Sequence, residues 1–600
     1  MLQAASLTIL LDKIRISGFR GLENIEVALP RIAILIGPNN CGKTSVLKAI
    51  HLAVGDYSRQ LTEADFRIDD KDLRTPVISV DIRLISTDTA GVRQKTFDRD
   101  WLAELGDKVR ADADGNQFVA YRTTAQVQAA KEGFLIERHI LNEWPTFTAW
   151  LSVATNASQK FLRRIELVPL ISIDAQRDIS TELNERTSFV GRILSLIKYD
   201  PTDVAALQDL IQEVNEQAVA KSSPLRKLAT HLELLNDSFG GSGKADVTPF
   251  PKKLRDISKN FSIHFGSTAA SSFSMEYHGM GTRSWASMLA VKAFVELATE
   301  LQAEDAKPLH PVVTAEEPEA HLHPNAQRSL FAQLLKSNGQ TIISTHSPYL
   351  AAMADIRDLR SLTLRNGRTQ CFAMTESISS ADMKQLNRDV LKTKGEVLFA
   401  RALVLYEGPT EDQVVPAMFE RWFGSSPFTK GVTLISADGN NYCPLVKLSG
   451  SLGIPVVIMS DNDSPNGVPI RDTVIKLLAK AVTESGVAQT PDWFAIEYLS
   501  SPNDFEAELV SVMGLRAEIE EAFLKKAKSF DDNPQFLRAQ SATLASLTDG
   551  QLIARMRAEK TGYSGFLADV ILDNTRGRPR DALVPPALQN LFTVLDGWLK

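Results

Sequence analysis

Short apolar runs alternate with stretches of helical spacing along most of this chain, a pattern typical of an α/β protein. Runs at residues 12–37, 75–87 and 132–152 predict strands, because their apolar positions are continuous or alternate. The first run leads into a glycine-rich segment, Gly37–Thr44, and the apolar positions of Ser45–Val54 then follow a helical period. Strand, glycine-rich loop and helix thus come in the order that a phosphate-binding site requires. The polar segment between the second and third runs shows no pattern that we interpret.

The period of the apolar positions changes to three and four residues from about residue 180 to 265, which predicts helices with apolar stripes. The stripe positions are Leu207, Leu210, Ile211 and Val214, followed by Leu225, Leu228 and Leu232. Residues 238–251, rich in glycine and proline, predict a hinge or loop. We interpret the segment as a helical arm inserted into the first domain. Two interpretations of its stripe stay open, namely internal core or a surface that pairs with a second copy.

A short buried strand is predicted at Val312–Ala315, with Glu316 and Glu317 directly at its C-terminal end. Open α/β sheets bind their ligands at this end of their strands. Because two buried carboxylates are costly without a cation or a proton, the pair predicts a bound Mg²⁺ and a water to be activated. The alternative is a solvated acidic turn. After an amphipathic helix, a second strand at 341–345 ends at His346.

The glycine-rich segment GPNNCGKT predicts how a nucleoside triphosphate is bound. Loop amides and the helix N-terminus bind phosphate oxygens, Lys43 bridges the terminal phosphates, and the Thr44 hydroxyl coordinates Mg²⁺. The candidate nucleotide ligands are Asn39, Asn40, Gly42, Lys43, Thr44 and Ser45. The glycine-rich loop and the acidic end of the strand at Val312–Ala315 are therefore both interpreted as parts of one nucleotide site.

The second half of the chain begins a new α/β pattern. Residues 361–374 predict a hairpin closed by Asn366 and Gly367, and the polar stretch 376–394 is the best candidate for a domain boundary. From Val397 onwards apolar strands and helical stretches alternate again. We therefore expect a second α/β domain in the C-terminal part.

Acidic residues follow two strands of this second pattern. One strand ends in Glu407, with Glu411 on the helix behind it, and the strand at 454–460 ends in Asp461 and Asp463. Acids two positions apart point the same way from an extended backbone. If the two strands are adjacent, four carboxylates share one cleft, and divalent ions are what offset such a concentration of charge. Two divalent ions are the usual device for in-line attack on a phosphodiester.

Composition and charge narrow the class of protein. A length of 600 residues with 44% hydrophobic content predicts roughly two to four domains. We find no run of about eighteen apolar residues and no export signal, so we expect no contact with a membrane. Three cysteines without metal-like spacing suit a reduced cytoplasm. The net charge of −7 argues against a general attraction to nucleic acid, so any such binding must come from local basic patches.

The first half resembles the ABC-type ATPases of the SMC, RecF and OLD (overcome lysogenization defect) group. The motifs GPNNCGKT, HGMGTRS, EEPEAHLHP and STHSP occur in the order of that group. The resemblance implies that Glu316 is the metal-side acid and Glu317 the base that polarises the attacking water. It further implies that His346 is the switch histidine that contacts the terminal phosphate. One departure is Glu316, where the class normally has aspartate.

The same resemblance implies that two subunits share the nucleotide. The segment HGMGTRS, a glycine-rich turn ahead of a helix, lies where the class carries its signature loop, with Gly281 and Ser284 as the residues that grip the nucleotide of the opposite subunit. His321–Pro324 resembles the loop that crosses the dimer interface. ATP, Mg²⁺ and at least a homodimer are therefore expected.

The segments LVLYEGPTE and IMSDND resemble a Toprim domain, the metal-binding module of topoisomerases, primases and OLD-family nucleases. The resemblance implies two divalent metals, Mg²⁺ or Mn²⁺, and Lys560 as the cation that stabilises charge on the phosphate. The implied metal ligands are Glu407, Glu411, Asp461, Asp463, Ser464 and Glu506. Among these, Glu407 and Asp461 are implied, with Lys560, to be catalytic. For Glu506 and Lys560 the alternative is a solvated surface charge.

The predicted fold class is α/β, with an ABC-type P-loop ATPase domain, an inserted helical dimerisation arm and a C-terminal, Rossmann-like Toprim nuclease domain. We predict ATPase parts at 1–179 and 266–376, the arm at 180–265 and the Toprim domain at 395–600. Such a fusion is the hallmark of OLD-family nucleases.

The predicted function is that of an ATP-hydrolysing, metal-dependent DNA endonuclease of the bacterial cytoplasm. The resemblance to the OLD family implies a role in phage defence or DNA repair. Its expected partners are DNA, further copies of itself and, as a candidate, a helicase. Two alternatives stay open. One is an ATP-driven DNA-binding clamp whose Toprim domain is only structural, and the other is a ribonuclease toxin with the same metal chemistry.

Overall fold

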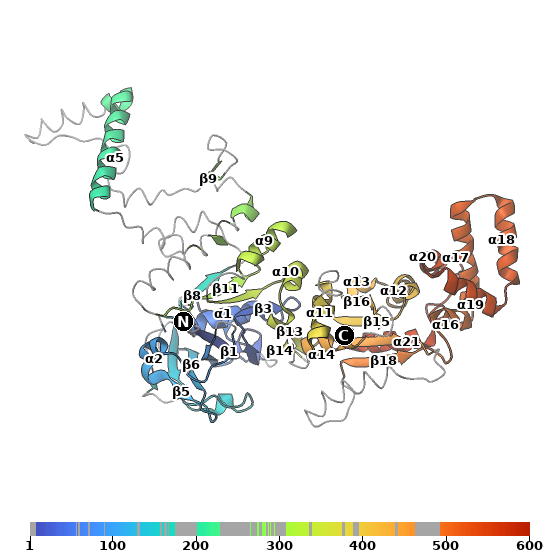
Figure 1. The fold of residues 1–600 in the computed structure, drawn as a ribbon, viewed down its shortest axis with the longest axis horizontal. Helices are drawn as coiled ribbons and strands as arrows, with labels where there is room; N and C mark the ends of the chain where they lie inside the picture. The colour runs from blue at the N-terminus through green and yellow to red at the C-terminus, as the bar shows by residue number, and fades with distance from the viewer. Residues whose placement is uncertain are drawn as a thin grey trace, which may run out of the picture.

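A computed structural model of the chain shows two α/β units side by side along the long axis of the molecule (Figure 1). It describes residues 8–174, 201–227, 264–265, 273–274, 279–283, 286, 288–289, 293, 308–462 and 492–600. Breaks within these ranges are at 56, 58–59, 70–72, 89–90, 129–132, 156–158, 161–164, 166, 335–338, 366, 375–378, 388–394 and 438–441.

An antiparallel sheet forms the outer layer of the first unit. Its strands are β1 (Thr8–Phe19), β2 (Leu22–Ala28), β4 (Val77–Thr87), β5 (Arg110–Ala111), β6 (Gln117–Val127) and β7 (Phe134–Ile140). They follow the order β2-β1-β4-β6-β5, and β7 pairs with β6. The first two predicted runs are thus confirmed as strands. The third was predicted too long, because β7 ends at Ile140 and a loop with a 3-10 turn, Trp150–Ser152, follows.

Strand β6 lies in the polar segment whose pattern we could not interpret. Its Arg122 is buried and donates to both carboxylate oxygens of buried Asp81, with nitrogen–oxygen distances of 2.7 and 2.9 Å. The same guanidinium also donates to the carbonyls of Trp150 and Val153. Because this buried ion pair and its hydrogen bonds replace apolar side chains, the strand lacks the alternation by which strands are found.

A mainly parallel sheet carries the nucleotide motifs, in the order β14-β13-β3-β12-β11-β8. Its strands are β3 (Ile32–Ile36), β8 (Leu170–Ile173), β11 (Val312–Glu316), β12 (Gln340–Ser344), β13 (Leu359–Arg365) and β14 (Arg368–Ala373). The predicted hairpin is confirmed, because β13 and β14 pair antiparallel on either side of Gly367. The predicted strand at Val312 is confirmed as β11, which has parallel neighbours on both sides.

Alternate residues of this sheet belong to two different cores, as the two-residue period of a strand requires. On β3, Ala33 and Leu35 face the core that contains α1 (Lys43–Val54) and the antiparallel sheet. Ile34 and Ile36 face the second core, with α9 (Pro324–Leu334) and α10 (Pro348–Met353). Burial on both faces explains the continuous apolar run of this strand.

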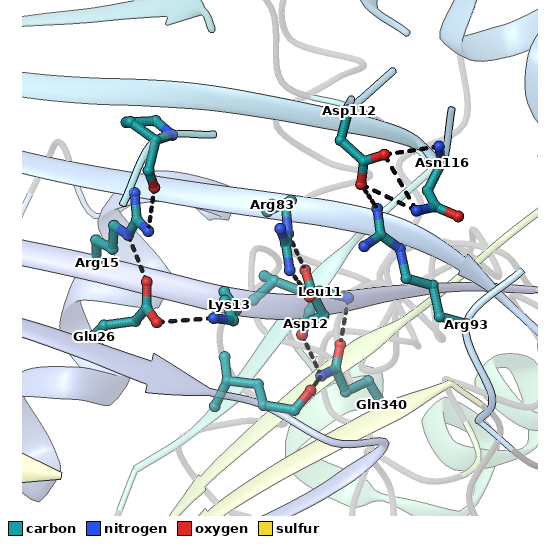
Figure 2. Close-up of polar contacts among 12 residues, drawn as sticks. Leu11, Asp12, Lys13, Arg15, Glu26, Arg83, Arg93, Asp112, Asn116 and Gln340 are labelled. Atoms are coloured by element: carbon teal, nitrogen blue, oxygen red, sulfur yellow. Dashed lines mark hydrogen bonds and ion pairs between the residues drawn. The ribbon is translucent and has the colours of Figure 1, made fainter. Parts of the chain in front are cut away.

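Gln340 joins the two sheets of the first unit (Figure 2). Its fully buried amide nitrogen donates to the carbonyl oxygens of Leu11, Leu29 and Pro30 at 2.8, 3.2 and 3.1 Å, while its amide oxygen accepts from the Leu11 amide at 3.1 Å. Nearby, Glu26 accepts from Lys13 and Arg15. One side chain thereby satisfies backbone groups of β1 and of the segment before β3.

The second unit is a four-stranded parallel sheet in the order β16-β15-β17-β18, as the sequence predicts for an α/β domain. Its strands are β15 (Ala402–Tyr406), β16 (Val432–Ser436), β17 (Val456–Ser460) and β18 (Phe494–Tyr498). Helices α12 (Pro409–Phe423), α13 (Pro427–Lys430), α14 (Cys443–Leu452) and α21 (Pro586–Leu599) belong to the same unit. Strands β15 and β17 are direct parallel neighbours, which confirms the predicted adjacency of the two acid-bearing strands.

A cluster of helices extends the second unit at the far end of the molecule (Figure 1). It consists of α16 (Phe505–Ser511), α17 (Leu515–Phe530), α18 (Pro534–Ser546), α19 (Asp549–Ala558) and α20 (Lys560–Asp573). Buried residues of these helices share a core with α12, among them Tyr563 and Leu567 of α20. This packing places Lys560, the first residue of α20, close to the start of α12.

The two units share a hydrophobic core. That core contains Leu350 of the first unit, Leu403 of the second and Val397 of the connecting 3-10 helix η11 (Gly395–Phe399). The predicted boundary 376–394 contains a helix, α11 (Ser380–Leu386), whose Asp382 forms an ion pair with Lys447 of α14 at 2.6 Å. Helix α11 is therefore packed against the second unit.

Helix α5 (Pro201–Lys221) confirms that part of the predicted arm is helical, and it stands apart from both sheets (Figure 1). Two stripe residues, Leu210 and Val214, are 58% and 54% exposed. Leu228, Leu232 and the predicted hinge 238–251 lie outside the described residues. In the part of the chain that the structure describes, no helix combines the length and apolarity needed to cross a membrane.

Candidate functional site

The loop between β3 and α1 is built on glycines that no other residue could replace without strain. Gly37 has φ 136° and Gly42 has φ 98°. A Cβ atom on Gly37 would lie 2.1 Å from the Leu362 carbonyl oxygen, and one on Gly42 would lie 2.6 Å from Leu22 Cδ2. The glycines thus let the loop turn tightly against β13 and β2, with its amides at the N-terminus of α1.

Lys43 is buried at the start of α1. Its ammonium donates to the carbonyl oxygens of Gly37 and Pro38, each at 2.8 Å. Burial lowers the pKa of Lys43, and the carboxylates of Glu317 and Glu319 counteract this. The loop therefore holds a positive charge beside its amides, where phosphate oxygens would bind.

Thr44 and Glu316, the two side chains predicted to face Mg²⁺, are brought together across the sheet. The Thr44 hydroxyl donates to Glu316 Oε1 at 2.5 Å. Thr44 comes from the first turn of α1, and Glu316 is the last residue of β11. A hydroxyl and a carboxylate oxygen are hard ligands of the type that Mg²⁺ takes, so the donor set fits this ion.

Glu317 follows with a backbone φ of 42°, which is unusual for a residue with a side chain. Its amide donates to the Ser344 carbonyl oxygen at 2.9 Å, and its Oε1 lies 3.5 Å from His346 Nε2. Burial, together with the charge on Lys43, lowers the pKa of His346, while Glu317 and Glu319 counteract the shift. The structure therefore gathers Lys43, Glu317 and His346, which lie far apart in sequence, at one end of the sheet.

The segment predicted as a signature turn differs from expectation, because residues 280–283 are helical. The prediction of a glycine-rich turn is wrong at Gly281. The glycine is needed there because close packing leaves no room for a side chain, and not because the backbone turns. A Cβ on Gly281 would lie 2.4 Å from the His321 carbonyl oxygen. Gly281 therefore packs on the loop that begins at His321, itself at φ 66°, and Ser284 lies outside the described residues.

In the second unit, Glu407 and Asp461 meet at neighbouring strand ends. Glu407 directly follows β15 and Asp461 directly follows β17. Glu407 Oε1 accepts from the Ser460 hydroxyl at 3.0 Å and from the Asp461 amide at 3.2 Å. These bonds hold the Glu407 carboxylate beside the backbone of Asp461. Asp463 and Ser464 lie outside the described residues.

A second pair of acids lies behind Glu407. Glu411, in the first turn of α12, is 3% exposed, and burial raises its pKa to about 7, with the charge of Glu506 adding to the effect. Glu506 is 1% exposed, so a solvated surface charge is wrong for this residue. Its Oε1 accepts from the Thr410 hydroxyl at 2.7 Å, and its Oε2 lies 3.5 Å from Lys560 Nζ. The Lys560 side chain is 42% exposed and reaches the pair from the N-terminus of α20.

Gly408 makes room for this arrangement. A Cβ at this position would lie 2.9 Å from Glu411 Oε2. The Glu411 carboxylate thus folds back over the N-terminus of α12, where backbone amides and the helix dipole favour a negative charge. In the described residues no group of three or more histidine, cysteine or acidic side chains forms a candidate metal cluster. Glu411 and Glu506 nevertheless suit a divalent cation, because they are buried carboxylates whose mutual repulsion a cation relieves.

We predict that this acid pair makes metal-free protein less stable at higher pH. The unfolded Glu411 carboxyl ionises near 4.5 and the folded one near 7, so the free energy of unfolding falls as pH rises between these values. The loss amounts to roughly 3 kcal/mol at most. Thermal unfolding in chelator across this pH range should show a shallower decline for Glu411→Gln than for the wild type. Added Mn²⁺ should then stabilise the wild type more than the variant, and equal pH dependence of the two proteins would contradict the assignment.

Sequence reasoning missed three residues around these acids and strands. Tyr442 is buried, and its pKa is raised by burial and then by Glu407 and Asp461. Thr410 contacts Glu506, and Glu319 contacts the turn that carries His346. Thr410 directly precedes Glu411, one of the predicted acids, and this position could have identified it from the sequence. Tyr442 could not have been identified in this way, because no residue near it in the sequence indicates that it lies close to Glu407 and Asp461.

Comparisons with known proteins agree with this two-part organisation. A family model described as "Protein of unknown function (DUF2813)" matches residues 9–391, and one described as "Overcoming lysogenization defect protein-like, TOPRIM domain" matches residues 398–463. The chain is 25% identical over 487 residues to an OLD nuclease of Thermus scotoductus, covering 76% of this chain and 82% of that protein.

Two further similarities extend over much of the chain. Over 491 residues the chain is 25% identical to the Old nuclease of Escherichia phage P2, covering 76% of this chain and 78% of that protein. Among solved structures, an Smc head bound to the C-terminal winged-helix domain of ScpA is 13% identical, covering 61% of this chain and 98% of that chain, with a TM-score of 0.34.

Proposed function

Because this chain belongs to the DUF2813 family and, with its OLD-like Toprim domain, to the OLD group, we propose that it is an ATP-hydrolysing, divalent-metal-dependent DNA endonuclease. The two relatives described above are nucleases, which supports the nuclease activity. The observation that carries the proposal is the meeting of Glu407 and Asp461 at adjacent strand ends, with buried Glu411 and Glu506 in the same unit.

In the proposed ATPase reaction, the loop amides and Lys43 bind the phosphates, and Thr44 with Glu316 would hold Mg²⁺. Glu317 accepts a proton from the attacking water, since its carboxylate faces the same end of the sheet as Lys43. His346, 3.5 Å from Glu317, contacts the terminal phosphate through its imidazole. Gly281 and Ser284 are proposed to complete the site from a second copy.

In the proposed nuclease reaction, Glu407, Glu411, Asp461, Asp463, Ser464 and Glu506 would hold the divalent ions. When bound, Mg²⁺ or Mn²⁺ supplies the charge that stabilises the attacking and leaving oxygens of the phosphodiester. Lys560, held near Glu506, adds a cation for the phosphate. Because burial raises the pKa of Glu411 to about 7, a cation bound at this carboxylate would favour its ionised form and so link metal binding to proton release.

The exposed stripe of α5 supports self-association through the arm. We predict that Leu210→Glu combined with Val214→Glu weakens the dimer at least about 100-fold, because two charges would be desolvated in the contact. Light scattering at several protein concentrations measures the mass. Gln208→Glu with Gln212→Glu, which adds the same charge at exposed positions of the same helix, is the matched control. An unchanged mass in a variant that circular dichroism shows to be folded would mean that the stripe does not pair two copies.

The proposed activity is tested by incubating the purified protein with supercoiled plasmid or total RNA, in Mg²⁺ or Mn²⁺, with and without ATP. Nicked or linear plasmid is the expected product, and chelator should abolish it. Cleavage of RNA alone would identify a ribonuclease instead. ATP hydrolysis and DNA binding without any cleavage would favour the clamp in which the Toprim domain is structural.

A further inference from the structure

Glu319 is a third carboxylate at the nucleotide site, and neither the motif roles nor the proposed reaction uses it. Its Oε1 accepts three hydrogen bonds from consecutive residues: the Thr345 hydroxyl at 2.6 Å, the His346 amide at 2.8 Å and the Ser347 amide at 3.2 Å. A single carboxylate oxygen thus holds the whole turn between β12 and α10. Bonds to an ionised acceptor are about twice as strong as neutral ones, so this contact can determine the conformation of the turn.

The held turn is the one that presents His346. Ser347 ends it as the N-cap of α10, and its hydroxyl accepts from the Leu350 amide at 3.3 Å. The same hydroxyl donates to Gln327 Oε1 of α9 at 2.8 Å, and the Ser347 amide also donates to the Thr345 hydroxyl at 2.9 Å. The ends of the turn are therefore fixed, and between them the His346 amide donates to Glu319.

Glu319 is half-buried, and its two carboxylate oxygens differ in their contacts. Its Oε2 is a buried oxygen without a hydrogen-bond partner among the described residues. A buried carboxylate oxygen without a partner is costly, and the three donors on Oε1 offset that cost. An apolar side chain at this position would avoid the cost but would leave the amides of His346 and Ser347 without this acceptor.

We propose that Glu319 is a positioning residue of the ATPase site, which holds the Thr345–Ser347 turn so that the His346 ring faces Glu317 and the terminal phosphate. This inference rests on the proposed ATPase activity. Glu319 acts through His346 and does not touch the reacting atoms. Its loss should therefore slow the chemical step and leave the binding of ATP, which depends on the loop at Lys43, largely unchanged.

The test is a double-mutant cycle in the full-length chain, with kcat and KM for ATP measured on Glu319→Ala, His346→Ala and the double variant. Glu319→Ala should lower kcat on the order of 10²-fold, because a small misplacement of a positioned group has that effect, with KM within about twofold of the wild type. The double variant should be no slower than His346→Ala alone, because the two residues act as one unit. Glu319→Gln keeps a carbonyl oxygen that can accept the three bonds, so it should recover most of the lost kcat.

Glu104→Ala, which removes an exposed carboxylate from α2 (Arg99–Leu105), is the control for loss of one charge and should leave kcat unchanged. The inference would be overturned if the kcat losses of the two single variants multiply in the double variant, or if Glu319→Ala leaves kcat unchanged. Turnover by the wild type would still support the proposed ATPase in either case. Absence of turnover in the wild type would instead overturn the proposed ATPase and the inference with it. If Glu319→Ala does not fold, Thr345→Val carries the test. It deletes the 2.6 Å donor to Glu319, together with the acceptor of the Ser347 amide, and should lower kcat without changing KM.

Discussion

Glu317→Gln should bind ATP as tightly as the wild type and hydrolyse it on the order of 10³-fold more slowly. The amide has the shape of the carboxylate and can keep the contact with His346, but it cannot accept a proton from water, and general-base catalysis contributes about 10²- to 10⁴-fold. The strained backbone at this residue, with φ 42° and its amide bonded to the Ser344 carbonyl, is the same for both side chains. Equilibrium binding of ATP and steady-state turnover, measured on the same preparation, separate the two effects.

Lys43→Ala is the contrasting variant, because it should lose affinity rather than turnover at saturation. The ammonium that lies against the Gly37 and Pro38 carbonyls balances the charge of the terminal phosphates, and alanine cannot replace it. A wild-type affinity in Lys43→Ala would count against the loop as the nucleotide site. Near-normal turnover in Glu317→Gln would refute its role as the base.

The sequence predicted the strand ends well because two independent signals coincide there. A fully apolar run predicts a strand buried on both faces, and acids directly behind it can lie only at the C-terminal edge of a parallel sheet. This reasoning placed Glu316, Glu407 and Asp461 without any knowledge of tertiary contacts. The adjacency of β15 and β17, which was only a condition in the sequence argument, is confirmed by their pairing.

What the sequence could not predict depends on contacts between distant segments. Glu319 stands inside a recognised motif, yet its importance lies in backbone amides more than twenty residues away. Glu506 could not be distinguished from a surface acid, because its burial comes from the packing of α16, α12 and α20. Arg122 replaces apolar packing on β6 with hydrogen bonds, which removes the pattern by which a strand is recognised. The role of Gln340 depends in the same way on carbonyl groups of a distant segment, although its strand was predicted.

Asp461→Ala should abolish DNA cleavage, with a loss on the order of 10³-fold or more, while ATP turnover stays within about twofold of the wild type. The aspartate is a proposed metal ligand at the end of β17, and its removal takes away charge that holds a divalent ion and hence several kcal/mol of transition-state stabilisation. The ATP site lies at the ends of β11 and β12 in the other sheet, so its residues keep their contacts. Plasmid cleavage in Mg²⁺ or Mn²⁺ and ATP turnover are measured side by side on the full-length chain, because the two units share one hydrophobic core.

Glu420→Ala, which removes an exposed acid from α12, is the matched control and should cut plasmid at the wild-type rate. Undiminished cutting by Asp461→Ala would refute the proposed nuclease site. Loss of both activities in that variant, with an unchanged unfolding temperature, has a different meaning. It would show that the two reactions are coupled between units that share a hydrophobic core at Leu350, Val397 and Leu403.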